Sequence, residues 1–439
     1  MEVKPMYNMV AKQWKEITVE DLKAPSNNAL ATGPFGSSIG SRFFQDHGFP
    51  VIRGSNLSND ALIRFNDHGL VFISEEKAAE FKRSIVRKGD LIFTCWGTIN
   101  QVGLIDDTAK HLEYVISNKQ MKFTPNPNKA DSLFLYYLFS SSEVQNKLRN
   151  QSIGSSVPGF NLGQLRAMCL KVPPLPEQRA IASTLRDVDV LLVALDHLIA
   201  KKRDIKQAAM QELLTGKRRL PGFACSKGYK QTEVGLIPEN WEIRSASSIL
   251  NKGRLGGNYP NQDKETNYPL IKMGNIGRGN IDNEKIEYII DGVVPNEMDR
   301  LRYGDLLFNT RNTLDLVGKV AVWRDELPLA YYNSNLMRLE FKPDEIASTF
   351  FANYAFNSTG CISRLREIAT GTTSVAAIYT RDLLKIPFPL PPLPEQHAIA
   401  TVLSDMDSEI AALEARREKT RALKQGMMQE LLTGRIRLV

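Results

Sequence analysis

The side chains that most often carry out chemistry are sparse in this chain of 439 residues. The histidines show neither the His-x-x-x-His spacing nor the His/Cys spacing of a metal site; they are His47, His68, His111, His197 and His397. The cysteines are widely separated, with no Cys-x-x-Cys pair; they are Cys95, Cys169, Cys225 and Cys361. This pattern predicts no metal centre and no disulfide framework, and it suits a reducing cytoplasm.

Motifs that would bind a nucleotide or a flipped base are also missing from the sequence. There is no Gly-x-x-x-x-Gly-Lys-Ser/Thr loop, whose backbone N–H groups would hold a phosphate. Each Pro-Pro pair is followed by leucine, whereas the motif that amino-methyltransferases use against a flipped base is Asn/Asp-Pro-Pro-Tyr/Phe. Pro343-Asp344 follows Glu340-Phe341-Lys342, which is the wrong order for a nuclease. We therefore predict a chain that is not an enzyme and has no catalytic, cofactor-binding or metal-binding residues of its own.

A stretch of 44 residues occurs twice, and the rest of the chain is organised around it. The first copy opens with Pro-Pro-Leu-Pro-Glu-Gln at Pro173 and closes with Met-Gln-Glu-Leu-Leu-Thr-Gly at Gly216; the second runs from Pro391 to Gly434. The copies are identical at 25 of the 44 positions, with a constant offset of 218 residues. Such a strict length is typical of a long helix, because each inserted residue rotates every later side chain by about 100°.

Each copy is predicted to form one long helix, at about 176–215 and about 394–433, with proline at its first position and glycine after its end. Apolar residues recur every three or four positions and form a heptad-like seam. The seam residues are Ile181, Leu185, Val188, Leu192, Leu195 and Ile199 in the first copy, and Ile399, Leu403, Met406, Ile410 and Leu413 in the second. Arg417 stands where the first copy has Ile199. Buried seams predict an antiparallel coiled coil, roughly 55–60 Å long.

The segments before the two helices are predicted to be α/β (α+β) globular domains in tandem, which share a framework. Short apolar runs bounded by turn residues predict strands, and residues 134–148 are predicted to be helical. Gly-Asp-Leu-Ile-Phe from Gly89 recurs as Gly-Asp-Leu-Leu-Phe from Gly304. The predicted order is a domain at 1–172, a helix at 173–216, a connector at 217–235, a domain at 236–390, and a helix with the C-terminal tail at 391–439. This is an internal repeat with an approximate two-fold axis.

The overall composition sets broad limits on function. A hydrophobic content of 42% allows real cores, and a formal charge of +7 with a pI near 9.0 is compatible with nucleic-acid binding. The most apolar long segment, 188–200, contains Asp189 and Asp196 and is too short to span a membrane. The N-terminal residues show no apolar run of the signal-peptide type. We therefore expect a cytoplasmic protein.

These motifs together resemble the specificity subunit of type I restriction-modification systems over essentially the whole chain. The resemblance rests on Pro-Pro-Leu-Pro-Glu-Gln before each long helix, Glu-Leu-Leu-Thr-Gly-Lys/Arg at its end, and the twofold globule–helix order. Gly33-Pro34-Phe35-Gly36-Ser37 and the Gly-Asp-Leu-Ile/Leu-Phe element also look like that family.

The resemblance implies two target-recognition domains, each reading one half of a split, asymmetric site in double-stranded DNA. It implies helices that set the half-site spacing and dock two methyltransferase subunits, with translocase–nuclease subunits joining that core. No cofactor is expected on this chain, whereas the partner subunits are expected to use S-adenosylmethionine, ATP and Mg.

Base readout is expected from arginine, lysine, asparagine and glutamine side chains on loops that face a groove. The candidates are Arg53, Asn56, Asn100, Gln101 and Lys119 in the first domain, and Lys272, Asn275, Asn309, Arg311 and Asn312 in the second. Small loop residues could lie against the DNA backbone; these are Ser155, Ser156, Thr372 and Thr373. Because the polar residues of the two domains differ, two different half-sites are predicted.

Several alternatives stay open at the level of sequence. The candidate asparagines could cap turns, and the Gly-Ser/Thr loops could be turns only. The basic residues Lys201, Lys202, Arg203, Lys206, Lys419, Arg421 and Lys424 could form a solvated face, dock a partner or contact phosphates. The Pro-x-x-Pro segments could be polyproline ligands. The whole chain could instead be a coiled-coil adaptor that joins two protein-binding domains, or a solitary methyltransferase.

Overall fold

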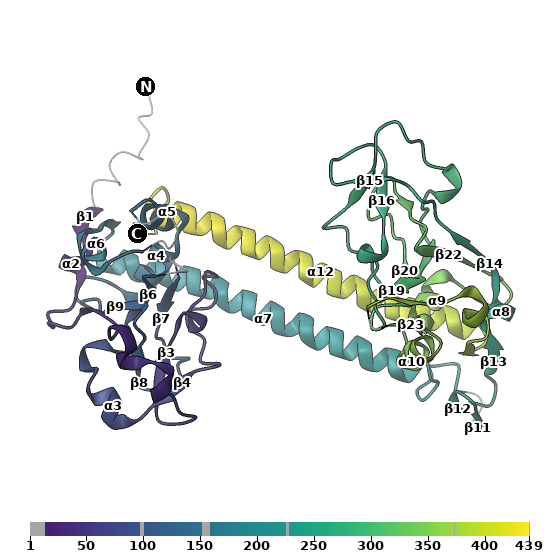
Figure 1. Ribbon diagram of the computed structural model, residues 1–439, viewed down its shortest axis with the longest axis horizontal. Coiled ribbons are helices and arrows are strands. Elements are labelled where there is room, and N and C mark those ends of the chain that lie inside the picture. The colour runs from purple at the N-terminus through teal and green to yellow at the C-terminus, as the bar shows by residue number, and fades with distance from the viewer. Residues whose placement is uncertain (1–13, 97–100, 152–158, 225–227, 373, 439) are drawn as a thin grey trace. The chain divides into compact units, whose positions relative to one another are not determined.

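The computed structural model describes residues 14–96, 101–151, 159–224, 228–372 and 374–438. The chain forms two compact units (Figure 1). Unit 1 comprises residues 1–196 and 415–439, and unit 2 comprises residues 197–414. Each unit therefore contains one globular domain together with part of both long helices, so the units divide the chain within the predicted helices rather than at their ends.

Unit 1 has a four-stranded sheet of order β2-β9-β6-β7, a second of order β4-β3-β8-β5, and the antiparallel pair β1-β10. In the described parts of unit 1, five short α-helices accompany these strands. The strands are β1 Lys15–Thr18, β2 Leu30–Thr32, β3 Phe49–Ile52, β4 Val71–Ile73, β5 Ile85–Arg87, β6 Leu91–Thr94, β7 Val102–Leu104, β8 Glu113–Ile116, β9 Gln120–Phe123 and β10 Cys169–Val172; the helices are α2 Val19–Leu22, α3 Glu75–Ala79, α4 Ser132–Ser140, α5 Ser142–Gln151 and α6 Leu162–Ala167.

Unit 2 repeats this plan with β14-β22-β18-β20, β15-β17-β16-β21 and the pair β13-β25, and it also contains the small sheet β19-β24-β23 and the hairpin β11-β12. Its strands are β11 Tyr229–Thr232, β12 Gly235–Pro238, β13 Glu242–Ser245, β14 Leu250–Leu255, β15 Asn261–Gln262, β16 Pro269–Ile271, β17 Glu287–Ile289, β18 Leu306–Asn309, β19 Arg311–Asn312, β20 Val320–Val322, β21 Tyr331–Tyr332, β22 Leu336–Phe341, β23 Thr370–Gly371, β24 Ala376–Ala377 and β25 Pro387–Leu390; its helices are α8 Ala246–Ile249, α9 Thr349–Phe356, α10 Thr359–Glu367 and α11 Thr380–Leu383.

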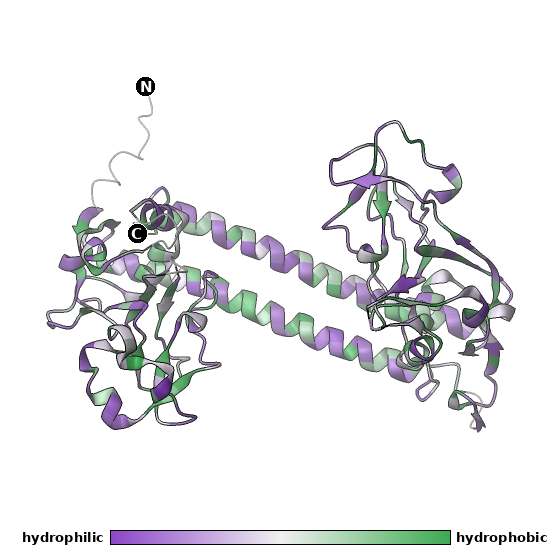
Figure 2. Ribbon diagram, in the orientation of Figure 1, coloured by the Kyte–Doolittle hydropathy of each residue, from purple (hydrophilic) through white to green (hydrophobic). Residues whose placement is uncertain are grey.

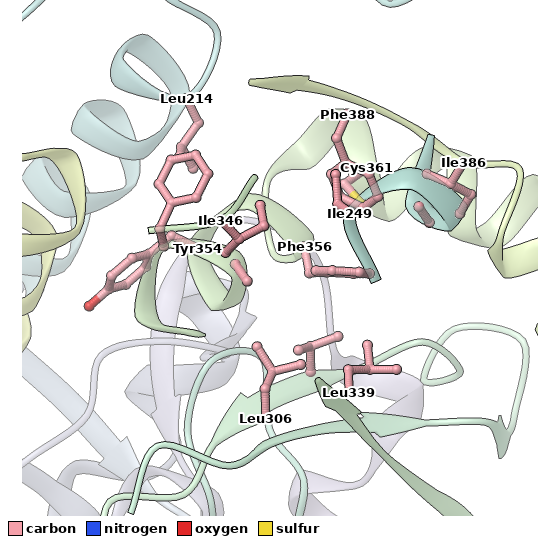
Figure 3. Packing of buried hydrophobic residues seen from close by; sticks show 14 of the residues in the cluster. Leu214, Ile249, Leu306, Leu339, Ile346, Tyr354, Phe356, Cys361, Ile386 and Phe388 are labelled. Atoms are coloured by element: carbon pink, nitrogen blue, oxygen red, sulfur yellow. The ribbon is translucent and has the colours of Figure 1, made fainter. Parts of the chain in front are cut away.

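The Gly-Asp-Leu-Ile/Leu-Phe element is a strand buried on both faces. In β6, Leu91 and Phe93 pack into the core that holds α4, while Ile92 packs into the core beneath β3 and β8. In β18, Leu306 and Leu307 divide between two cores in the same way. Successive side chains of a strand point to opposite faces, so an uninterrupted apolar run can fill two layers. Figure 3 shows Leu306 and Leu339 packed with α9 residues in the larger core of unit 2.

The helix predicted over 134–148 is wrong in one respect, because the structure has two helices there. α4 ends at Ser140 and α5 begins at Ser142. Ser141 is extended (φ −68°, ψ 147°), and its Oγ donates to the carbonyl of Leu138 and accepts from the N–H of Val144. Short serine side chains satisfy backbone groups at helix ends, which favours a break at this point.

The two long helices are confirmed as α7, Leu175–Leu213, and α12, Leu393–Leu431. The glutamine of Pro-Pro-Leu-Pro-Glu-Gln fastens the start of each helix to its own domain. Gln178 accepts from the N–H of Asp131 and donates to the carbonyls of Lys129 and Pro173. Gln396 makes the same three bonds in unit 2, accepting from Ala347 and donating to Glu345 and Pro391. The repeated glutamine is therefore a structural residue.

The glutamate of the same motif joins each helix start to the tail that follows the other helix. In unit 2, both carboxylate oxygens of Glu395 accept from Arg219, and Oε2 also accepts from Trp241 Nε1 at 3.0 Å. In unit 1, Glu177 is paired with Arg437 in the same way. Both glutamates are buried. Each long helix is thus clamped at its start by a residue that lies 176 positions away in unit 2 and 260 positions away in unit 1.

The seam residues are buried or partly buried within their own units. Ile181 and Leu185 join the unit 1 core together with Leu431 of α12 and the next residue, Leu432. Ile399 and Leu403 join the unit 2 core together with Met210 and Leu213 of α7 and the next residue, Leu214. Leu192, Leu195, Ile199 and Ile410 are buried, whereas Val188, Met406 and Leu413 are half-buried. Figure 2 shows apolar and polar residues alternating along both helices.

Ion pairs between the helix segments run in antiparallel order within each unit. In unit 1, Lys424 contacts Asp189 at 2.6 Å and Arg417 contacts Asp196 at 3.2 Å. In unit 2, Lys202 contacts Glu409 at 2.6 Å, and Lys206 and Arg203 contact Asp407 and Glu414. The interpretation of Lys206 and Lys424 as part of a solvated face is therefore wrong: Lys424 is buried, Lys206 is half-buried, and both carry the charge that neutralises a facing carboxylate.

Candidate nucleic-acid interface

The loops after β3 and β16 hold Arg53 with Asn56, and Lys272 with Asn275. Asn56 is fully buried; its Oδ1 accepts from the N–H of Arg53, and its Nδ2 donates to the carbonyls of Asn66 and His68. Asn275 bonds in the same pattern, to Lys272, Asp282 and Lys285. Both amides are thus used within their loops. The two asparagines stabilise the turns of their own loops, and this is the structural role that was the alternative to base readout.

The cations beside these asparagines are half-buried and partly engaged. Arg53 Nη2 donates to the carbonyl of Gly69 at 3.1 Å, and its Nε has no partner in the described part of the chain. Lys272 Nζ pairs with Glu287 at 2.8 Å and with Asn261 at 3.2 Å. Lys272 would have to leave a carboxylate to reach DNA, so Arg53 is the better placed of the two.

Near the end of β6, unit 1 has two of the predicted DNA-binding residues, Gln101 and Lys119, and one residue that was not predicted, Trp96. Gln101 bonds through its backbone to Thr94, and its Nε2 donates to the carbonyl of Leu57. Lys119 is exposed, and its carbonyl accepts from Cys95. Trp96, which the sequence reasoning missed, is 51% exposed. Asn100, Ser155 and Ser156 lie outside the described residues.

The corresponding place in unit 2 gathers Arg311, Asn312 and Thr372 on one small sheet. Arg311 and Asn312 form β19, which pairs with β24, and β24 pairs with β23 immediately before Thr372. Arg311 and Thr372 are exposed, whereas Asn309 is fully buried. Asn312 Oδ1 accepts from the N–H of Thr313. Thr373 lies outside the described residues.

Trp96 and Arg311 occupy equivalent positions in the two units. Trp96 bridges to Gly159 just as Arg311 pairs with Ala377, and the carbonyls of Cys95 and Thr310 accept from Phe160 and Ile378 respectively. One backbone frame therefore presents an exposed indole in unit 1 and an exposed guanidinium in unit 2. An indole can stack or make apolar contact, whereas a guanidinium can donate two hydrogen bonds to guanine. In the sequence, the available signal was a tryptophan that follows an apolar run predicted to be a strand.

A cluster of cations in unit 2 was also missed by the sequence reasoning. Arg278 Nη2 donates to the carbonyl of Asp315 at 3.1 Å, and Arg366 lies 3.8 Å from the carboxylate of Asp315, which is 88% exposed. Burial, and then the positive charge of Arg366, lowers the pKa of Arg278. Burial, and then the charge of Arg278, lowers the pKa of Lys319. The three cations thus lie close enough to affect one another's pKa, and among the described residues only Arg366 pairs with the exposed Asp315 carboxylate, so this surface is attractive to phosphate.

A family model described as the type I restriction modification DNA specificity domain matches residues 36–206 and 238–421. The chain is 27% identical over 331 residues to the type I restriction enzyme MjaVIII specificity subunit of Methanocaldococcus jannaschii, covering 74% of this chain and 75% of the relative. It is 22% identical over 400 residues to the EcoKI specificity subunit of Escherichia coli, covering 90% of this chain and 83% of the relative.

Solved structures share the fold at low sequence identity. A crystal structure of the type I restriction-modification S subunit from M. genitalium is similar with a TM-score of 0.55 at 14% identity, covering 98% of each chain. A chain from a study of complex assembly and conformational transition of the type I R-M system has a TM-score of 0.53 at 18% identity, covering 98% of this chain and 99% of that one. In the regions that the structure describes, no helix is long and apolar enough to cross a membrane.

Proposed function

The chain belongs to the type I restriction-modification DNA specificity family, and on this premise we propose that its two globular domains each read one half of a bipartite, asymmetric DNA site. Membership makes the chain a DNA-recognition subunit rather than an enzyme. The observation that carries the half-site proposal is the pair Trp96 and Arg311. Two domains that recognise different DNA sequences need the same backbone arrangement with different exposed side chains.

We propose that Arg53, Gln101, Lys119 and Trp96 face DNA in the first domain, and that Arg311, Asn312 and Thr372 do so in the second. Arg278, Lys319 and Arg366 would contact the backbone. Asn100, Ser155, Ser156 and Thr373 are kept as candidates from sequence alone. Backbone contacts would supply salt-dependent affinity, and the groove-facing side chains would supply the discrimination between bases.

The long helices are proposed to set the half-site spacing and to dock two methyltransferase subunits. A helix of 39 residues is about 58 Å long. On α7, Val190, Leu191 and Val193 are exposed, and exposed apolar side chains that lie close together favour a protein partner. In this proposal the methyltransferase subunits bring S-adenosylmethionine, translocase–nuclease subunits bring ATP and Mg, and the complex acts in the cytoplasm.

The test is a domain exchange in the complex with the methyltransferase subunit. Residues 1–172 would be replaced by the first domain of a relative, and methylated adenines would be mapped across a plasmid library. We expect one half of the methylated sequence to change and the other half to stay. The matched exchange of residues 236–390 should change the opposite half. Methylation that ignored both exchanges would rule out readout by these domains.

The alternative of a coiled-coil adaptor between two protein-binding domains makes a different prediction for the unmodified complex. Phosphate contacts release counterions, so the dissociation constant for DNA should rise steeply with salt concentration. Fluorescence anisotropy with a labelled duplex measures this slope. Absence of DNA binding at low salt would favour the adaptor.

A further inference from the structure

Unit 2 contains a cavity of about 890 Å³ where α7 and α12 meet α9, α10 and the loop after η6 (Met273–Asn275). Its wall includes the cations Arg203, Lys206, Arg278 and Arg324 and the carboxylates of Glu326, Asp407 and Glu414. Tyr303 and Phe350 form an aromatic pair in the same wall, with ring centroids 5.8 Å apart. The internal repeat offers a direct comparison, because unit 1 has the same Tyr-Asp-Lys group on its own helices.

In unit 1, an arginine side chain reaches that group. Tyr137 Oη donates to Asp189 at 2.5 Å, and Lys424 pairs with the same carboxylate. Arg64 contacts Asp189 at 3.1 Å, Tyr137 at 3.1 Å and Asp106 at 2.9 Å. The four charges of this group balance, since two cations face two carboxylates.

In unit 2, the equivalent of Arg64 is Asn280. The equivalence follows from the buried asparagines. Asn56 Nδ2 donates to the carbonyl of Asn66, two residues after Arg64, and Asn275 Nδ2 donates to the carbonyl of Asp282, two residues after Asn280. Asp106 is likewise replaced by Arg324, because Ile105 bonds to Asp90 as Trp323 bonds to Asp305. Tyr354 still donates to Asp407, at 2.7 Å, and Lys206 still pairs with it. The long arginine side chain that reaches the Tyr-Asp-Lys group in unit 1 has no counterpart at Asn280.

The exchange also puts the guanidinium of Arg324 where unit 1 has the carboxylate of Asp106, so this place becomes more positive. Lys206 and Arg203 are matched by Asp407 and Glu414. Arg324 Nη1 instead donates to the carbonyls of Gly279 and Val322, and Arg278 Nη2 donates to that of Asp315. Among the described residues, neither guanidinium forms an ion pair, and Arg278 Nη1 has no hydrogen-bond partner.

The charge at Arg278 is not needed for this backbone arrangement to form, because unit 1 has the same arrangement without a charged residue at this position. Its equivalent in unit 1 is Leu62, since the next residues, Ile63 and Gly279, accept from Tyr136 and Asn353 respectively. Burial, and then the nearby charge of Arg366, lowers the pKa of Arg278, so its surroundings disfavour the charged guanidinium. An arginine kept half-buried beside another cation, next to a cavity, is suited to an incoming anion.

We propose that this cavity binds a phosphate group through Arg278 and Arg324. Guanidinium groups match the geometry of phosphate oxygens and bind them with charge-assisted hydrogen bonds. The volume accommodates a mononucleotide, with Tyr303 and Phe350 available to a base, or one phosphate of a DNA strand. Both sources offer the same oxyanion. The DNA source rests on the proposed function, whereas the free nucleotide does not.

The test uses the full chain and three probes: inorganic pyrophosphate, AMP, and a 20-base-pair duplex at several salt concentrations. Arg278→Leu copies the residue of unit 1, and the double variant Asn280→Arg/Arg324→Asp copies the unit 1 charge arrangement. Arg381→Gln removes an exposed cation of α11 as a matched control. Thermal unfolding without probe shows whether each variant is folded.

If the phosphate is free, pyrophosphate or AMP raises the unfolding temperature of the wild type, and both cavity variants bind it at least about tenfold more weakly. If it belongs to DNA, the small probes do nothing and the salt slope of duplex binding falls by about 1 in Arg278→Leu, but not in Arg381→Gln. Wild-type and variant chains that respond alike to all three probes would overturn the proposal, even where DNA binding itself is intact.

Discussion

Glu395 joins three segments of unit 2 that are far apart in the sequence. Its carboxylate accepts from Arg219, which follows α7, and from Trp241, which follows the hairpin β11-β12. Arg219 also lies over the Trp241 ring, with its guanidinium carbon 5.7 Å from the centroid. The carboxylate is buried and accepts from three N–H donors, so removing its charge leaves those donors without an equivalent partner and lowers the stability of the fold.

Glu395→Gln should therefore destabilise unit 2 by about 3 kcal/mol, because it leaves the Arg219 guanidinium buried without a counter-charge. The midpoint of urea unfolding, followed by tryptophan fluorescence, measures the loss. Lys88→Gln is the control, since its pair with Asp107 is exposed on both sides. Equal midpoints for the two variants would show that the clamp adds nothing to stability.

Asp106 links the stability of unit 1 to pH. Burial alone would raise the pKa of Asp106, but hydrogen bonds from Thr108 and Arg64 outweigh it and lower the pKa below 3.8. A folded-state pKa below the unfolded one favours the charged carboxylate in the folded chain. Its contribution is thus present above pH 3.8 and is lost as the pH falls through the lowered value.

We expect Asp106→Asn to reduce the urea midpoint of unit 1 at pH 7, by an amount corresponding to about 1 kcal/mol, and the difference from wild type to shrink towards pH 3. Urea titrations at pH 7, 5 and 3 check this trend. Asp107→Asn is the control, because that side chain is 81% exposed. A difference that grew on acidification would contradict the assigned direction.

At the scale of elements, the turn after each long helix closes on a glycine whose backbone conformation only glycine adopts easily. Gly216 has φ +70° and Gly434 has φ +74°. A Cβ at Gly216 would lie 2.5 Å from Pro238, and one at Gly434 would lie 3.1 Å from the Trp14 ring. The Thr-Gly ending of the repeat thus both stops the helix and lets the following tail pack against it.

Gly216→Ala should lower the unfolding temperature more than Gly222→Ala. Both positions have positive φ and share a backbone penalty of about 1 kcal/mol, but nothing lies within 4 Å of a Cβ at Gly222. The difference between the two variants isolates the clash with Pro238. Differential scanning calorimetry measures it, and equal shifts would mean that Pro238 moves away freely.

At the scale of the whole molecule, the repeat explains why the long helices keep their length while the domains vary. Each helix contributes to both compact units, as the pairs Asp189–Lys424 in unit 1 and Lys206–Asp407 in unit 2 illustrate. A deletion in either helix would shift partners in both units. Trp96 and Arg311 lie outside these helices, and each pairs within its own unit.

The spacing proposal belongs to this scale. Inserting four residues after Ala200 and four after Leu413 should lengthen both helices by about 6 Å and change the number of base pairs between the half-sites. Mapping methylated sites in the assembled complex gives the spacer. The same four residues placed after Gly222, outside both helices, should leave it unchanged. An unchanged spacer in the helix variant would remove the helices from spacing.

The sequence by itself determined the repeat, both long helices to within two residues, and the strands at Leu91 and Leu306, because strict periodicity and buried apolar runs are local signals. It also indicated the family. Only the tertiary structure decided which polar residues are free: Asn56 and Asn275 are consumed by their loops, whereas Trp96 and Arg311 are exposed. Lys424 and Glu395 find partners 235 and 176 residues away (424 − 189 and 395 − 219). Hydrogen-bond partners and burial depend on contacts between distant segments, which no local pattern encodes.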